Sequence, residues 1–377
     1  MTPRWANLSE ADQSTFRAIT AFLMGRLEER ATIEWALRLP PNERVKRAAL
    51  LDLVDGPQGS GIREPWRTAW RLINESWQTQ HPTERDETRT HHLGHRVAAG
   101  DRSGVIIEEI SDLVAPRLGV KPFTEWDLLN RKPPKRPKLV EQLFSAKLTS
   151  SDVIDPRVLR LDRVREVDFL VELANRLDAV IVRALDLARR LNWNTKRQSY
   201  QIGRVHRVYY VLEIDQTDGQ HDPDEFNHGI AASVKLLHFV VARIAAFNIQ
   251  AALAFGHRWK VHRSPLHTRL WSALARDSRI ASAADVASAL LSMDDELFWN
   301  QNTNPEIAEL RARRFNEFSP PDQAAVLARL RKLPPRSQWS KGLESERLQS
   351  ARLYWALREL RRIANRFTGR KVDLHAP

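Results

Sequence analysis

Side chains that could bind a metal ion and activate water gather in one polar segment, TDGQHDPDEFNH. Imidazole and carboxylate groups are the ligands that divalent metals take in many hydrolases. A metal-dependent hydrolase would draw its ligands from this set: His221, Asp222, Asp224 and His228. Histidine–aspartate phosphohydrolases hold such ligands on helices, and Pro223 disfavours a helix directly after Asp222. A solvated acidic loop is the alternative, and it is the interpretation that the proline favours.

Three histidines in the motif THHLGH form a second candidate for a metal site. His91 and His95 are four residues apart and would share one face of a helix. Gly94 weakens a helix at this position, and no carboxylate nearby completes the ligand set. The motif therefore favours a solvated loop.

The glycine-rich stretch LDLVDGPQGSGIREPW, residues 51–66, could hold a phosphate. A nucleotide-binding P-loop follows the pattern G-x-x-x-x-G-K-[ST], in which lysine reaches the phosphates and the hydroxyl binds magnesium. The glycine spacing fits, but Ile62 and Arg63 stand where lysine and serine or threonine belong. The spacing does not match the dinucleotide-binding fingerprint either. The stretch therefore predicts a turn between two helices, with a stop at Gly56 and a new helix beginning near Pro65.

An arginine–histidine pair near the end of the sequence tests the nuclease class. Arg370 and His375 have the five-residue spacing of an acid–base pair that some small helical ribonucleases carry on one helix. They follow Gly369 in a tail that cannot hold such a pair in register. No serine lies in a nucleophile-elbow pattern. The residue patterns favour a protein that is not an enzyme and that needs no cofactor.

The chain is strongly basic, which makes nucleic acid a candidate partner. Its formal net charge is +12, and 47 of its 59 basic residues are arginine. Arginine pairs with phosphate or carboxylate through a planar fork of donors. The arginines are also spread along the whole chain, as a genome rich in arginine codons would produce. Composition alone therefore leaves both explanations open.

Three groups of basic residues would form a nucleic-acid interface. They are Arg131, Lys132, Lys135, Arg136 and Lys138; Arg189, Arg190, Lys196, Arg197, Arg204 and Arg207; and Arg358, Arg362 and Arg366. Trp193 and Trp259 lie near basic residues and could stack on bases. The other tryptophans mostly follow helical spacing, as Trp66, Trp70 and Trp77 do, which predicts a packed stripe.

Composition excludes several other classes. The absence of cysteine rules out disulfides, iron–sulfur clusters and a cysteine nucleophile. It agrees with a cytoplasmic location, and the first residues contain no apolar run of signal-peptide length. The long apolar segment 228–256 is interrupted by Lys235, His238 and Arg243, which are costly in a bilayer. We therefore expect it to be a central buried helix, and we expect no membrane partner.

Helical periodicity dominates the sequence. Apolar residues recur every three or four positions over residues 160–191 and again over residues 353–367. Ser9 followed by Asp12 predicts a capped helix that extends to about residue 29. Only residues 207–214, RVYYVLEI, have strand-like composition, and they lack an evident partner strand.

Proline and glycine divide the helices into short units. The motifs PPNE and PPDQ each precede an apolar helix that ends at a Gly–Pro or Pro–Pro pair, which suggests two copies of a helical repeat. The basic, proline-rich segment RKPPKRPK predicts a connector at residues 131–138. We therefore predict an all-α fold of stacked helical hairpins, solenoid-like and in two lobes, residues 1–130 and 139–377.

Two segments carry a resemblance to a known class of proteins. They are GPQGSGIREPWRTAWRLINESW, residues 56–77, and DDELFWNQNTNPEIAELRARRFNEFSPPDQAAVLARLRKLPPRSQW, residues 294–339. Both resemble the C-terminal helical regions of large prokaryotic anti-phage defence proteins that carry sirtuin-like or STAND-type ATPase effectors. The resemblance implies a non-catalytic scaffold or sensor whose effector activity resides in a partner chain. No catalytic residue transfers, since the Rossmann fingerprint and the Walker lysine are missing.

The sequence thus predicts a helical interaction or sensor module that recognises a partner protein encoded nearby. A basic DNA- or RNA-binding subunit is the alternative, and a metal-dependent hydrolase is the more distant one. Stacked helices offer large binding faces without any catalytic group.

Overall fold

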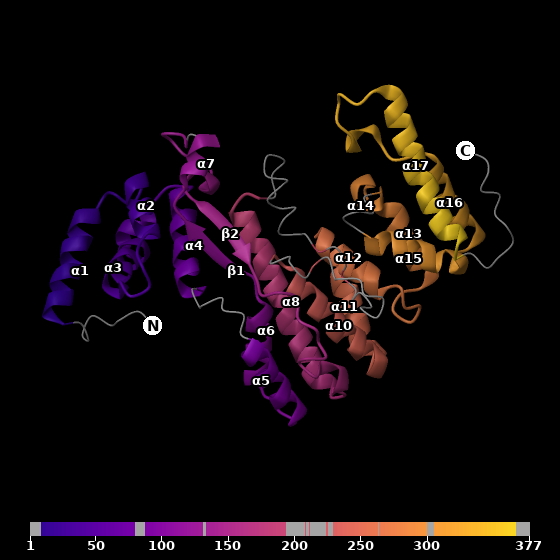
Figure 1. The fold of residues 1–377 in the computed structure, drawn as a ribbon, viewed down its shortest axis with the longest axis horizontal. Helices are drawn as coiled ribbons and strands as arrows, with labels where there is room; N and C mark the ends of the chain where they lie inside the picture. Colours follow the sequence, from indigo (N-terminus) through magenta and orange to yellow (C-terminus); the bar gives the residue numbers. More distant parts are fainter. Residues whose placement is uncertain are drawn as a thin grey trace.

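The computed structural model describes residues 9–79, 87–130, 133–193, 229–262, 264–299 and 305–366, together with Val208, Val211 and Asp224. Sixteen α-helices, five short 3-10 helices and one two-stranded sheet make up the regular structure of these residues. This confirms the all-α prediction. Figure 1 shows the helices following one another along the longest axis, from the indigo N-terminal helices to the yellow C-terminal ones.

The first half of the chain forms seven helices and the sheet. The helices are α1 (Glu10–Leu23), α2 (Arg30–Leu37), α3 (Arg44–Asp55), α4 (Trp66–Thr79), α5 (Glu87–Ala98), α6 (Gly104–Val114) and α7 (Glu125–Asn130). Strands β1 (Arg117–Lys121) and β2 (Ser145–Thr149) pair antiparallel, with Arg117 opposite Thr149.

The described residues of the second half contain helices and no strand. It contains α8 (Val167–Arg190), α10 (Ala231–Phe247), α11 (Ile249–Val261), α12 (Pro265–Leu274), α13 (Ala283–Ser292), α14 (Asp295–Trp299), α15 (Pro305–Arg314), α16 (Pro320–Arg331) and α17 (Ser345–Ala364). The predicted helix over residues 160–191 is confirmed as α8, although α8 begins at Val167 and not near residue 160. The segment 207–214, which has strand-like composition, lies almost entirely outside the described residues.

Two hydrophobic cores hold these elements together. The N-terminal core joins α1–α4, the sheet and the last turn of α8, whereas the C-terminal core joins α5, α6, most of α8 and α10–α17. Leu118 and Val140 lie on either side of residues 131–138 and belong to the same core, because β1 pairs with β2 across that segment. The cores therefore group the chain differently from a division at residues 131–138.

The predicted central helix over residues 228–256 is two helices, and its continuity was predicted wrongly. Helix α10 ends at Phe247, and α11 begins at Ile249. Between them Asn248 accepts a hydrogen bond from the Ala251 backbone N–H at 3.1 Å, which caps α11. Apolar residues on both sides of this cap concealed the break. The expected burial is confirmed for α10, where even Lys235 is almost inaccessible.

The glycine-rich stretch turns a corner between α3 and α4, as predicted. Gly56 ends α3, a short 3-10 helix spans Pro57–Gly61, and α4 begins directly after Pro65. Trp70 is buried and donates its indole N–H to the Leu27 carbonyl at 2.9 Å. Trp66 and Trp77 pack against the same core, which confirms the packed tryptophan stripe.

The THHLGH motif is helical, so the predicted loop is wrong. All three histidines are exposed on α5. Gly94 does not break this helix, since its missing side chain allows close packing instead. A Cβ at Gly94 would lie 2.1 Å from the carbonyl oxygen of Val158, so only glycine fits.

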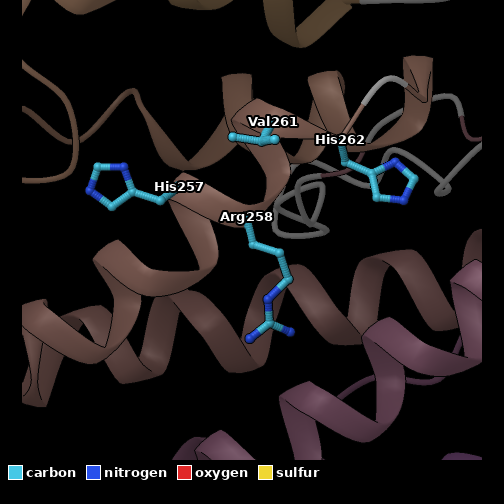
Figure 2. Close-up of a pocket in the computed structure, with 4 residues that line it drawn as sticks. All are labelled: His257, Arg258, Val261 and His262. Carbon is cyan, nitrogen blue, oxygen red and sulfur yellow. The ribbon is translucent and has the colours of Figure 1, made fainter.

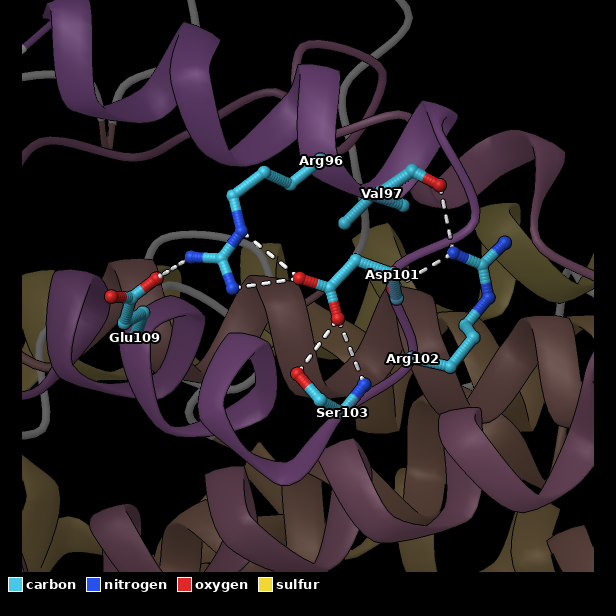
Figure 3. A network of polar contacts seen from close by, with 6 residues as sticks. All are labelled: Arg96, Val97, Asp101, Arg102, Ser103 and Glu109. Atoms are coloured by element: carbon cyan, nitrogen blue, oxygen red, sulfur yellow. Dashed lines mark hydrogen bonds and ion pairs between the residues drawn. The ribbon is translucent and has the colours of Figure 1, made fainter.

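A polar corner fixes α5 against α6 (Figure 3). Arg96 donates to Asp101 at 2.7 Å and to Glu109, and Asp101 accepts from the backbone and hydroxyl of Ser103 at 3.0 and 2.7 Å. The Ser103 and Arg96 hydrogen bonds lower the pKa of Asp101 to about 2. The neighbouring Arg102 donates to the Val97 carbonyl at 2.7 Å.

We predict that this corner weakens in acid. The pKa of Asp101 is lower in the folded protein than in the unfolded chain, where it is 3.8. The ionised carboxylate therefore stabilises the fold in full when the pH is above 3.8. That contribution is lost as the pH falls towards about 2. Asp101→Asn should therefore be less stable than the unmodified protein at neutral pH, with a difference that shrinks as the pH falls below 4. Urea unfolding across this range measures it, and a constant difference would contradict it.

Candidate functional site

Helix α17 presents an exposed face of mixed apolar and basic character. Its inner face buries Leu348, Ala356, Glu359 and Ile363. On its outer face, Tyr354 is 60% exposed and Leu357 is 42% exposed. We call the outer face formed by Tyr354, Leu357, Arg358 and Arg361 the α17 surface. These residues follow the i, i+3, i+4, i+7 spacing that places side chains on one side of a helix.

Buried and half-buried ion pairs set the orientation of α17. Glu359 accepts a hydrogen bond from Arg311 of α15, and both side chains are 1% exposed. Glu309 of α15 pairs with Arg366 at 2.8 Å and with Arg362 at 3.5 Å. These contacts turn one side of α17 inward, which leaves the α17 surface outward.

The cations of the α17 surface are not neutralised. Arg358 and Arg361 are exposed, and neither forms an ion pair with any residue that the structure describes. Trp339 and Trp355 pack edge to face near the start of the helix, with ring centroids 6.4 Å apart. In Figure 1, α17 lies at the end of the molecule that is remote from α1–α3.

Sequence reasoning missed this surface because it expected Leu357 to be buried. The spacing of Leu353, Leu357 and Leu360 predicts an apolar stripe that faces the core. The structure buries Ala356 and Glu359 instead, because the Arg311 pair directs that side of the helix inward. The signal available in the sequence was Glu359, an acidic residue that lies within the apolar pattern of this helix.

The described members of the basic groups predicted for nucleic acid lie in separate parts of the molecule. Lys135, Arg136 and Lys138 are exposed, whereas Arg131 and Lys132 lie outside the described residues. Helix α7, which precedes this connector, and α17 lie in different parts of the molecule (Figure 1).

The second predicted basic group is engaged in local ion pairs. Arg189 pairs with Asp186, and Arg190 pairs with Glu75 at 3.2 Å and with Asp186 at 2.9 Å. The remaining members are outside the described part of the chain: Lys196, Arg197, Arg204 and Arg207. Of the third group, Arg362 and Arg366 hold α17 to α15, and Arg358 alone belongs to the α17 surface.

The two tryptophans proposed to stack on bases are buried. Trp193 is 4% exposed and Trp259 is fully buried. The indole N–H of Trp259 donates to Asp178 at 3.0 Å. Their stacking role was predicted wrongly, since each ring packs in a hydrophobic core.

Of the four predicted metal ligands, only Asp224 is described. It is fully buried and pairs with Lys235 of α10 at 3.2 Å. The other three, His221, Asp222 and His228, lie outside the described residues. Among the residues that the structure does describe, no three histidine, aspartate or glutamate side chains are placed to hold a metal ion.

Helix α11 borders an open depression lined by His257, Arg258, Val261 and His262. Figure 2 shows the His257 and His262 rings pointing in opposite directions. The two imidazoles therefore do not converge on one ligand. Val261, at 80% exposed, adds an apolar contact between them.

A buried carboxylate on α8 fixes the position of α11 next to the depression. Asp178 of α8 accepts from Trp259 at 3.0 Å and from Arg258 at 3.1 Å, and it lies 3.5 Å from the His267 ring nitrogen. Burial raises the pKa of Asp178, but the close His267 ring and the hydrogen bonds from Trp259 and Arg258 outweigh burial and lower that pKa. The His262 ring stacks on His267 with centroids 3.8 Å apart, and burial lowers the pKa of His262. This cluster ties α8, α11 and α12 together.

Comparisons with known proteins give no indication of the function. No protein-family model matches the chain, and no curated protein or solved structure matches it significantly. Within the described residues, no helix is both long enough and apolar enough to cross a membrane.

Proposed function

We propose that this protein is a helical interaction module that binds a partner protein through the α17 surface. The observation that supports the proposal is the exposure of Tyr354 and Leu357 beside two cations, Arg358 and Arg361, that form no ion pair among the described residues. Tyrosine and arginine are the residue types that contribute most binding energy at protein interfaces. A helix with i, i+3, i+4, i+7 anchors is a common recognition element.

The partner is expected to be acidic, with an apolar groove. Leu357 and the Tyr354 ring supply the apolar contact, and the two arginines favour carboxylates around it. The scaffold or sensor role in anti-phage defence that the sequence resemblance implies is part of this proposal. In that role the effector activity belongs to the bound partner.

Co-expression with the products of neighbouring genes tests the proposal. We expect one of these products to co-purify with the protein and to dissociate more readily at high salt. The double variant Tyr354→Ala, Arg358→Glu should weaken this complex by at least about tenfold, because it removes an anchor and reverses a charge. Isothermal titration calorimetry with the purified partner measures the change.

Arg331→Glu provides the matched control. Arg331 is an exposed arginine on the neighbouring α16, so the variant has the same change in charge at a different place. It should bind the partner like the unmodified protein. Equal affinity of the double variant and the control would rule out the α17 surface. A mobility shift with DNA or RNA, and no protein complex, would favour the nucleic-acid alternative.

A further inference from the structure

Arg276 has a guanidinium group for which the described structure provides no partner. Seven arginines have a buried guanidinium nitrogen without a hydrogen bond: Arg30, Arg47, Arg102, Arg190, Arg243, Arg276 and Arg311. Six of them use their other nitrogens in hydrogen bonds or ion pairs, for example Arg311 with Glu359 and Arg243 with the Val164 carbonyl. Arg276 makes neither kind of contact with any described residue. Its Nε is buried without a hydrogen bond although the side chain as a whole is half-buried, and an unsatisfied charged donor of this kind needs an explanation.

Arg276 lies where several helices of the C-terminal core meet. It follows the end of α12, which packs against α10 and α15. The carbonyl of the preceding residue, Ala275, accepts a hydrogen bond from Arg314 of α15 at 2.6 Å. This contact places the start of the 275–281 turn against the end of α15, next to the exposed Arg313.

The carboxylates around Arg276 are already engaged. Glu306 accepts from Arg269 at 2.7 and 3.0 Å and from the backbone N–H of Val211 at 2.7 Å. Glu309 pairs with Arg362 on α17 and with Arg366, which directly follows that helix. Glu309 and Glu306 attract Arg276 from a distance, but neither forms an ion pair with it.

Excess positive charge at this junction affects the neighbouring groups. Burial, and then repulsion from Arg313, lower the pKa of Arg276. Burial, and then the charges of Arg276 and Lys235, lower the pKa of His238 on α10 to about 4. His238 is therefore neutral at physiological pH and adds no further positive charge. A bound anion would relieve the repulsion between Arg276 and Arg313.

We propose that Arg276 and Arg313 form a binding site for a phosphoryl group. Arginine is suited to phosphate because its planar fork donates two parallel hydrogen bonds to the oxygens. Arg313 and Arg366 are exposed, so the site is open on the α15–α17 side, whereas Arg276 is partly enclosed. A partly enclosed guanidinium suits a terminal phosphate, carried either by a small nucleotide or by the end of a single strand. The proposal does not depend on the α17 surface.

Isothermal titration calorimetry of the full chain tests this site. The probes are inorganic phosphate, pyrophosphate, a nucleoside triphosphate, and a short oligonucleotide with and without a 5′-phosphate. We expect the phosphorylated probes to bind, and Arg276→Gln and Arg313→Gln each to weaken that binding by at least about tenfold. A stronger response to the nucleotide or to the phosphorylated oligonucleotide identifies the source of the phosphate.

Arg279→Gln is the control, because Arg279 lies in the same turn but already pairs with Asp277 at 2.6 Å. It should bind every probe as the unmodified protein does. A second measurement separates binding from folding. In phosphate-free buffer, Arg276→Gln should melt at the same or a higher temperature than the unmodified protein, since it removes an uncompensated charge. Added phosphate should raise the melting temperature of the unmodified protein and of Arg279→Gln, but not that of Arg276→Gln. Absence of binding by every probe, or equal binding by Arg276→Gln, would overturn the proposal.

Discussion

Glu359→Gln should lower the free energy of unfolding by about 3–5 kcal/mol, because it leaves the buried Arg311 guanidinium without a counter-charge. Both side chains are 1% exposed, so water cannot replace the lost carboxylate. Arg311 also donates to the Phe298 carbonyl at 3.2 Å and lies over the Phe298 ring, which keeps it in place after the substitution. Denaturant unfolding followed by tryptophan fluorescence measures the loss.

Two further variants make this prediction specific. Glu344→Gln changes an exposed glutamate just before the same helix and should cost no more than about 0.5 kcal/mol. The double variant Arg311→Met, Glu359→Leu replaces the whole pair with apolar side chains and should recover most of the stability. A loss below about 1 kcal/mol for Glu359→Gln would mean that the ion pair does not hold α17 to α15.

Gly59→Ala should destabilise the corner between α3 and α4 by about 3 kcal/mol. A Cβ at Gly59 would lie 1.6 Å from the carbonyl oxygen of Val54 and 2.4 Å from its carbonyl carbon. Both atoms are backbone at the end of α3, so the clash cannot be relieved by a change of rotamer. The corner or the end of α3 must move, and with it the packing of Trp66 and Trp70 on α4. Thermal unfolding followed by circular dichroism measures the effect.

Gly61→Ala is the matched control in the same short 3-10 helix. No atom lies within 4 Å of the Cβ that it would introduce. It should change the free energy of unfolding by no more than about 0.5 kcal/mol. Similar losses for the two variants would show that glycine is needed here for its backbone freedom, and not for the close approach to Val54.

The parts of the fold that depend on local residue chemistry could be predicted from the sequence. Apolar spacing identified α8, and Ser9 caps α1 by accepting from the Asp12 backbone, although that helix ends at Leu23 and not near residue 29. The PPDQ motif marks the start of α16 at Pro320, where Ser319 is the N-cap. The PPNE copy differs, since α3 begins only at Arg44, so the two helix starts are not equivalent.

The parts that depend on distant contacts could not be predicted. Strands β1 and β2 have five residues each and no clear alternation, and each is a strand only because the other lies beside it. The burial of Asp224 depends on Lys235, and the outward position of Leu357 depends on the Arg311–Glu359 pair. Sequence periodicity reports which residues share a helix face, but tertiary ion pairs decide which face is buried.

Helix α8 has a consequence for how the chain folds during synthesis. It spans 24 residues, and its last turn completes the N-terminal core through Leu187, Ala188 and Leu191. Helices α1–α4 leave the ribosome long before these residues do. The N-terminal core must therefore remain unfinished until α8 has emerged, and α8 arrives with most of its length committed to the other core. The C-terminal core waits longer still, because it is complete only after α17 has emerged.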